Sequence, residues 1–107
     1  MTMPITLNEE NFYETIQSAT VVLVQFTSDF CGSCQAMAHS LEQVREAFDE
    51  SIIIAEVKTI DNPDWAEAFA VQSTPTVLLF YKGKNTNRLT GVHTKSAVSK
   101  WIREVVA

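Results

Sequence analysis

The chain has 107 residues, of which 46% are hydrophobic and 20% are charged, so we expect residues 1–107 to form one domain with its own core. Thirteen acidic against eight basic residues give a formal net charge of −5. Nucleic acid and anionic membranes would repel this charge, which disfavours both as partners. Two cysteines can close only one disulfide, which excludes a small scaffold held together by several bridges.

No targeting or membrane segment is visible. Residues 1–18 lack the basic start of a signal peptide, and the longest apolar runs, 21–24 and 52–55, are far shorter than the ~20 residues that cross a bilayer. We therefore expect a cytoplasmic protein. In that reducing compartment, a lone cysteine pair is more often catalytic or metal-binding than structural.

Apolar runs and amphipathic segments alternate along the chain. Short runs rich in Val and Ile indicate buried strands, and apolar residues at spacings of three and four indicate helices. The segment 6–9 (TLNE) fits a helix capping box, with Asn8 as an equal candidate for the cap. The predicted elements, in chain order, are a weak strand at 4–6, a helix to about residue 18, a strand at 20–26, a long helix at 31–48, a strand at 52–59, a short helix from Pro63 to about Ala70, a strand at 76–81, a turn at 82–85, a strand at about 87–91 and a helix capped by Thr94.

This order predicts an α/β fold with a central sheet and helices on both of its faces. Ligand sites in such sheets lie beyond the carboxyl ends of the strands. The segment 30–34 (FCGSC) is at such a point, between a predicted strand end and a predicted helix start.

Cys31 and Cys34 are three residues apart at that helix start. Their β-carbons would be roughly 5–6 Å apart on a helix, so a small adjustment of the first turn lets a disulfide close. The helix dipole and its unpaired N–H groups favour a thiolate, which lowers the pKa of a thiol there. Cys31, nearest the loop, is the predicted nucleophile, and Cys34, one turn deeper, is the predicted resolving cysteine of a mixed disulfide.

Two other interpretations of the pair are weighed against this one. The cysteines could be inert core residues. They could also bind zinc, but the further ligands would have to be His39 and His93, whose spacing matches no zinc module. We therefore expect no metal.

The motifs together resemble the thioredoxin family over about residues 7–106. The resemblance rests on VVLVQF before FCGSC, the spacing to DNP, STPT before an apolar strand, the YKGK turn and Gly91. It implies a thioredoxin fold, with a mixed sheet of four or five strands flanked by four helices. It also implies dithiol–disulfide exchange with target proteins, no bound cofactor, and re-reduction by a flavin-dependent reductase that consumes NADPH. A monomer is the simplest expectation.

The resemblance further implies a surface on which targets dock. Pro75 matches the family's cis-proline, which faces the cysteine pair, and an X-Pro bond is the only peptide bond for which cis is inexpensive. The exposed backbone of Thr74 could pair with an extended target segment. The docking residues expected around Cys31 are Phe30, Gly32, Ser33, Ser73, Thr74, Pro75, Thr90 and Gly91.

Several positions depart from the family pattern. Phe30 and Ser33 replace the Trp and Pro of the family's Trp-Cys-Gly-Pro-Cys motif. Ser33 adds a hydroxyl and a backbone N–H, either of which can stabilise a Cys31 thiolate. We therefore predict a higher reduction potential than that of the same protein with Pro at position 33. Gln25 replaces a buried aspartate and cannot act as a base. Glu56, in an apolar run on the next strand, could point inward and supply the missing general base, or it could reach solvent at the strand end.

The leading function is a thiol–disulfide oxidoreductase that reduces protein disulfides. The alternatives are a binding module that no longer turns over and a redox sensor whose partner affinity changes on oxidation. Intact Cys31, Cys34 and Pro75 favour the enzyme, whereas Gln25 mildly favours the binding module.

Overall fold

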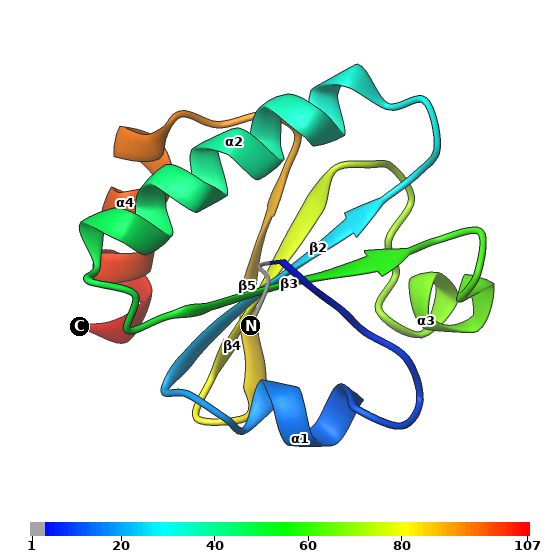
Figure 1. The fold of residues 1–107 in the computed structure, drawn as a ribbon, viewed down its shortest axis with the longest axis horizontal. Helices are drawn as coiled ribbons and strands as arrows, with labels where there is room; N and C mark the ends of the chain where they lie inside the picture. The colour runs from blue at the N-terminus through cyan, green and yellow to red at the C-terminus, as the bar shows by residue number, and fades with distance from the viewer. Residues whose placement is uncertain (1–3) are drawn as a thin grey trace.

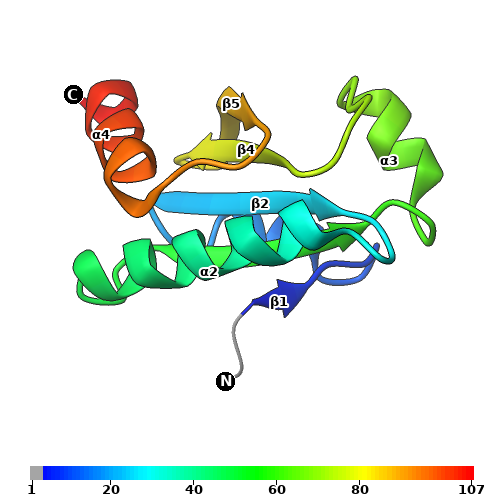
Figure 2. The ribbon, with the colours of Figure 1, turned by 90° about the horizontal axis from the view of Figure 1, so that it is seen from above.

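One mixed sheet forms the centre of the molecule, with helices on both faces (Figures 1 and 2). The computed structural model describes residues 4–107, and within them it contains five strands and four helices. In chain order these are β1 (Ile5–Thr6), α1 (Phe12–Ile16), β2 (Val21–Thr27), α2 (Gly32–Ala47), β3 (Ile53–Lys58), α3 (Pro63–Ala68), β4 (Thr76–Tyr81), β5 (Lys84–Thr90) and α4 (Lys95–Val106). The predicted order and type of the elements are confirmed.

The strand order across the sheet is β1-β3-β2-β4-β5. β1 and β2 pair with β3 in parallel, whereas β4 pairs antiparallel with both β2 and β5. The carboxyl ends of β2 and β3 therefore lie at the same edge of the sheet, next to the amino end of β4. The loops that leave or enter these strands meet at that edge.

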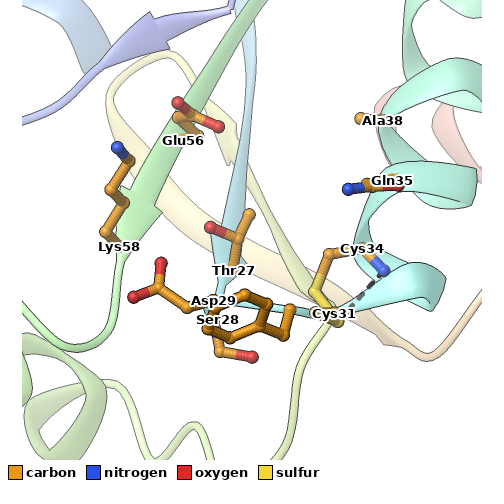
Figure 3. A pocket seen from close by; sticks show the side chains of 10 residues that line it. Thr27, Ser28, Asp29, Cys31, Cys34, Gln35, Ala38, Glu56 and Lys58 are labelled. Carbon is orange, nitrogen blue, oxygen red and sulfur yellow. Dashed lines mark hydrogen bonds between the residues drawn. A yellow bond between two sulfur atoms is a disulfide. The ribbon is translucent and has the colours of Figure 1, made fainter.

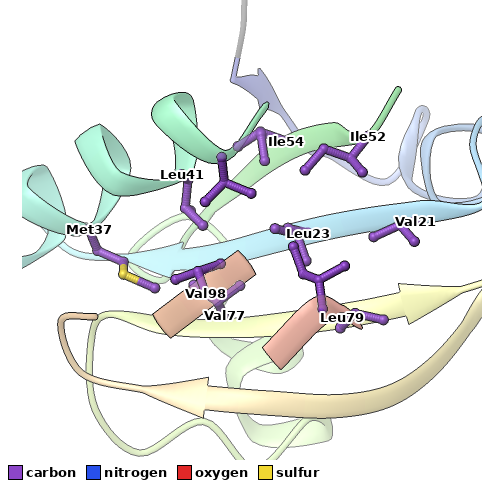
Figure 4. Packing of buried hydrophobic residues seen from close by; sticks show 11 residues of the cluster. Val21, Leu23, Met37, Leu41, Ile52, Ile54, Val77, Leu79 and Val98 are labelled. Carbon is purple, nitrogen blue, oxygen red and sulfur yellow. The ribbon is translucent and has the colours of Figure 1, made fainter. Parts of the chain in front are cut away.

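Side chains alternate between two cores because successive residues of a strand point to opposite faces. One core packs β2, β3 and β4 against α2 and α4 (Figure 4), and its central members include Leu23, Leu41 and Leu79. The other core packs the same strands against α1 and α3, with Phe26 and Leu78 at its centre. All residues from 21 to 26 are buried, as predicted for a strand covered on both faces.

The capping box predicted at 6–9 is wrong. Thr6 ends strand β1, and its hydroxyl does not bond a helix N–H. The Asn8 side chain accepts the backbone N–H groups of Glu10 and Asn11 and so closes a turn that precedes α1. The helix begins only after that turn, and it is shorter than predicted.

The turn between the last two strands is also shorter than predicted. It consists of Lys82 and Gly83, whose φ angles are 54° and 83°. Two central residues with positive φ are typical of the type I′ turns that join hairpin strands tightly. Strand pairing therefore resumes at Lys84, before the predicted start of the strand. Within residues 4–107, no helix is both long enough and apolar enough to span a bilayer.

Candidate active site

Cys31 and Cys34 form a disulfide at the start of α2, with their Cα atoms 5.2 Å apart. Cys34 lies in the first turn of the helix, whereas Cys31 is the N-cap residue and has an extended backbone (φ −104°, ψ 97°). The predicted closure of the pair is therefore confirmed. The adjustment that allows it is the departure of Cys31 from helical geometry, which brings its sulfur back over the first turn.

Three groups that are able to donate a hydrogen bond surround the Cys31 sulfur. The backbone N–H of Cys34 donates to Sγ at 3.1 Å, as expected for a side chain that caps a helix. The hydroxyl of Ser33 lies 3.4 Å from the same sulfur, and that of Thr74 lies 3.8 Å away. Cys31 itself is half-buried, whereas Cys34 is only 5% exposed. A large molecule approaching from solvent therefore reaches Cys31 much more readily than Cys34.

The loop before the pair presents an unusual aromatic residue. Phe30 has φ 57°, and its side chain is fully exposed. At Gly32, which follows Cys31, no atom beyond the chain neighbours and the backbone of the same helix lies within 4 Å of the place where a β-carbon would be. The protein surface on this side of Cys31 is therefore open to a partner.

The loop before β4 faces the pair from the other side. The peptide bond between Thr74 and Pro75 is cis, as the resemblance implies. The Pro75 carbonyl accepts the N–H of Gly91 at 2.9 Å, which joins this loop to the end of β5. The Ser73 carbonyl accepts the hydroxyl of Thr76, and Thr90 pairs with Thr76 across the sheet. The structure thus brings the residues predicted to form the docking surface to one end of the sheet.

A cleft of about 270 Å³ opens beside the disulfide (Figure 3). Its walls come from the loop after β2, the first two turns of α2 and the end of β3. The lining residues are Thr27, Ser28, Asp29, Phe30, Cys31, Cys34, Gln35, Ala38, Glu56 and Lys58. Glu56 is half-buried and accepts a hydrogen bond from the Thr6 hydroxyl at 3.1 Å. The cleft therefore combines a carboxylate and the deeper cysteine within one solvent-accessible space.

The zinc interpretation finds no support in the arrangement of side chains. His39 is exposed on α2, and the Nε2 atom of His93 lies 3.0 Å from the Thr90 carbonyl. In the part of the chain that the structure describes, no three His, Cys, Asp or Glu side chains are grouped so that they could hold a metal ion.

A protein-family model described as thioredoxin matches residues 3–104, almost the whole chain. The chain belongs to the thioredoxin family. The thioredoxin of Alicyclobacillus acidocaldarius subsp. acidocaldarius is 32% identical over 102 residues, which are 95% of this chain and 97% of that protein. A bifunctional thioredoxin reductase/thioredoxin of Mycobacterium leprae (strain TN) is 32% identical over 95 residues, which are 89% of this chain and 21% of that protein. A mutant thioredoxin from Halobacterium salinarum NRC-1 shares the fold, with a TM-score of 0.85, 24% identity, and coverage of 96% of this chain and 90% of that one.

Membership of the thioredoxin family confirms the predicted family, fold and chemistry. The chain is a thiol–disulfide oxidoreductase that reduces protein disulfides, and its redox centre is its own Cys31–Cys34 pair. Thioredoxins generally work with a thioredoxin reductase and with proteins that carry disulfides.

Gln25 has a contact that sequence reasoning missed. Its side chain is 3% exposed, and Nε2 donates to the backbone carbonyl of Cys34 at 3.0 Å. The amide thus fixes the first turn of α2 to the central strand β2, directly beneath the cysteine pair. A glutamine between apolar neighbours in a buried strand was the available signal, because a buried amide nearly always has a hydrogen-bond partner.

Proposed function

We propose that this chain receives electrons from NADPH through a flavin-dependent thioredoxin reductase and passes them to disulfides in target proteins. The observation that carries the proposal is the half-buried Cys31 sulfur, which caps α2 and is bonded to a deeply buried Cys34. The relative that is both thioredoxin reductase and thioredoxin supports a reductase of this kind as the electron donor.

The proposed cycle begins with both cysteines reduced. The Cys31 thiolate attacks one sulfur of the target disulfide, and the other target sulfur leaves as a thiolate and takes up a proton. Cys34 then loses its proton and attacks the Cys31 sulfur of the mixed disulfide, which releases the second target sulfur. Two electrons have moved to the target, and the chain holds the Cys31–Cys34 disulfide until the reductase returns two electrons.

We propose that targets dock on the surface predicted around Cys31. Within the described residues the backbone of Thr74 makes no hydrogen bond, so its polar groups are free to pair with an extended target segment. The exposed ring of Phe30 offers apolar contact area. Gly32 and Gly91 have open space where a β-carbon would lie, which supports close approach of a target backbone.

We propose Glu56 as the general base for Cys34. Its position on β3 is directly beside that of Gln25 on β2, so both side chains face α2. Glu56 lines the same cleft as Cys34, and a cleft of about 270 Å³ has room for a water molecule that relays the proton.

Replacing Glu56 tests this role. Glu56→Gln should slow the resolution of a mixed disulfide by about tenfold or more, because the lost base no longer takes the Cys34 proton. Asp29→Asn is the matched control, since Asp29 is the other carboxylate in the cleft, and it should keep the wild-type rate. A Glu56→Gln variant with the wild-type rate and pH profile would show that Glu56 is not the base.

Insulin reduction by dithiothreitol tests the overall function. The wild-type chain should accelerate the precipitation of reduced insulin, and Cys31→Ser should not. A binding module or a redox sensor would leave the wild type and Cys31→Ser at the same rate. Replacing dithiothreitol with NADPH and a thioredoxin reductase then tests the electron source, because turnover requires the reductase to recognise this chain.

The proposal includes a monomer that works in the cytoplasm. In residues 4–107 the large apolar side chains that remain exposed are Tyr13, Phe30, Ile60 and Val92. Both faces of the sheet are already covered by helices of the same chain. Light scattering during size-exclusion chromatography should give a mass near 12.0 kDa, and a dimer mass would contradict the monomer.

A further inference from the structure

Two hydroxyl groups from outside α2 form a chain that ends at the Cys31 sulfur. Ser28 Oγ lies 2.8 Å from Thr74 Oγ1, and Thr74 Oγ1 lies 3.8 Å from Cys31 Sγ. Ser28 belongs to the loop after β2, whereas Thr74 immediately precedes the cis peptide bond. The chain therefore connects the two loops on either side of the nucleophile, which are 46 residues apart in sequence.

The direction of these hydrogen bonds decides their effect on the sulfur. A hydroxyl has one proton to donate and two lone pairs that accept. If Ser28 donates to Thr74, the Thr74 proton is free to point at the sulfur. If Thr74 donates to Ser28 instead, it turns lone pairs toward Cys31 and disfavours negative charge there. A thiolate at Cys31 selects the first direction, and in that direction each bond polarises the next.

We infer that the Thr74 hydroxyl, oriented by Ser28, donates to the Cys31 thiolate and stabilises it during the exchange reaction. The inference rests on the proposed role of Cys31 as the nucleophile. Thr74 contacts the reacting sulfur itself, whereas Ser28 acts through Thr74 and is a positioning residue. This donor approaches from the loop before β4, so it is independent of the two donors that α2 supplies, the Cys34 N–H and the Ser33 hydroxyl.

The stabilised thiolate matters at two points of the cycle. A larger thiolate fraction at neutral pH supplies more of the attacking species. A more stable Cys31 thiolate also leaves more readily when a mixed disulfide between Cys31 and the reductase is resolved by a second thiol of the reductase. A target segment docked on Thr74 would exclude water from the hydroxyl and the sulfur, which strengthens the hydrogen bond between them.

The test measures the acid dissociation constant of Cys31 in the reduced protein from thiolate absorbance. Thr74→Val keeps the branched side chain before the proline and removes the hydroxyl, and Ser28→Ala removes only the group that orients it. Each variant should lower the dissociation constant by about threefold, a modest effect because the contact is long and partly open to water. The double variant should lower it no further than Thr74→Val alone, because the two hydroxyls act as one chain.

Thr59→Val is the matched control. Its hydroxyl lines the same groove as Ser28 and Thr74 but bonds the Thr27 carbonyl and not the sulfur. This variant should leave the dissociation constant unchanged. The charged residues of the neighbouring cleft, Asp29, Glu56 and Lys58, are the same in every variant.

The outcomes separate this inference from the proposed function. A dissociation constant unchanged in both Thr74→Val and Ser28→Ala would overturn the inference while the wild type still accelerates insulin reduction. Equal effects of Thr59→Val and Ser28→Ala would also overturn it, because a general loosening of the loops would then explain the change. A wild type that fails to accelerate insulin reduction would instead overturn the proposed function. Ser28→Ala gives the answer even if Thr74→Val does not fold.

Discussion

Replacing Ser33 with alanine should lower the reduction potential of the Cys31–Cys34 pair. The Ser33 hydroxyl is 3.4 Å from the Cys31 sulfur, and it belongs to an exposed side chain. A hydrogen bond to a charged group contributes about 1.5–3 kcal/mol, and exposure reduces this to about 1 kcal/mol. Loss of that stabilisation from the reduced form corresponds to about 20 mV in reduction potential at a pH where reduced Cys31 is a thiolate.

Ser33→Pro should shift the potential further in the same direction. Proline removes the hydroxyl and also the backbone N–H that serine supplies in the first turn of α2. The assay equilibrates each protein with glutathione buffers of known ratio and counts free thiols by alkylation and mass spectrometry. Ser40→Ala, on the same helix but outside the cleft residues, is the control and should match the wild type. Variants at position 33 that are as oxidising as the wild type, or more so, would refute the reasoning.

Three further predictions concern stability and are read from urea unfolding. Leu79→Ala should lower the free energy of unfolding by about 2–5 kcal/mol, because it leaves a cavity in the fully buried core under α2 and α4; a loss below about 1 kcal/mol would be inconsistent with this packing. Gly91→Ala should lower the free energy of unfolding by about 1–2 kcal/mol, because Gly91 has a φ of +85°, a backbone conformation that is strained for alanine. Gly32→Ala should lower it by less, because the φ of Gly32 is not in the left-handed region. The Arg45 guanidinium hydrogen-bonds Glu42 and holds the pKa of that carboxyl below its ordinary 4.5. The ion pair therefore stabilises the fold above that pH, and this stabilisation is lost as the pH falls through the folded-state pKa of Glu42. Glu42→Gln should make the free energy of unfolding fall less steeply as the pH is lowered. An unchanged dependence of this free energy on pH would argue against the pair.

The fold could be predicted from sequence wherever one face or both faces of an element are buried. The nearly all apolar segment 20–26 predicted a strand covered on both sides, and burial of residues 21–26 confirms it. The start of α1 could not be predicted in this way. The polar residues of segment 6–9 have several possible backbone partners, and β1 pairing with β3 directed the Thr6 hydroxyl to Glu56 and not to a helix N–H.

In the candidate site, too, features set by local sequence could be predicted, whereas contacts between distant segments could not. The spacing of Cys31 and Cys34 at a helix start was enough to predict a disulfide that can close, because both residues belong to one turn. The contact between Ser28 and Thr74 depends on how two loops meet across the sheet, and no local pattern encodes that. The cis geometry before Pro75 followed only from the family resemblance, since an isolated X-Pro bond is usually trans.

Trapping of the mixed disulfide tests the central assignment, in which Cys31 attacks and Cys34 resolves. A reduced Cys34→Ser variant mixed with a disulfide-bonded target should accumulate a covalent adduct through Cys31, detectable by non-reducing electrophoresis and by mass spectrometry of the joined peptides. A reduced Cys31→Ser variant should form no adduct under the same conditions, because its remaining thiol is only 5% exposed. An adduct formed through Cys34, or none formed through Cys31, would contradict the account.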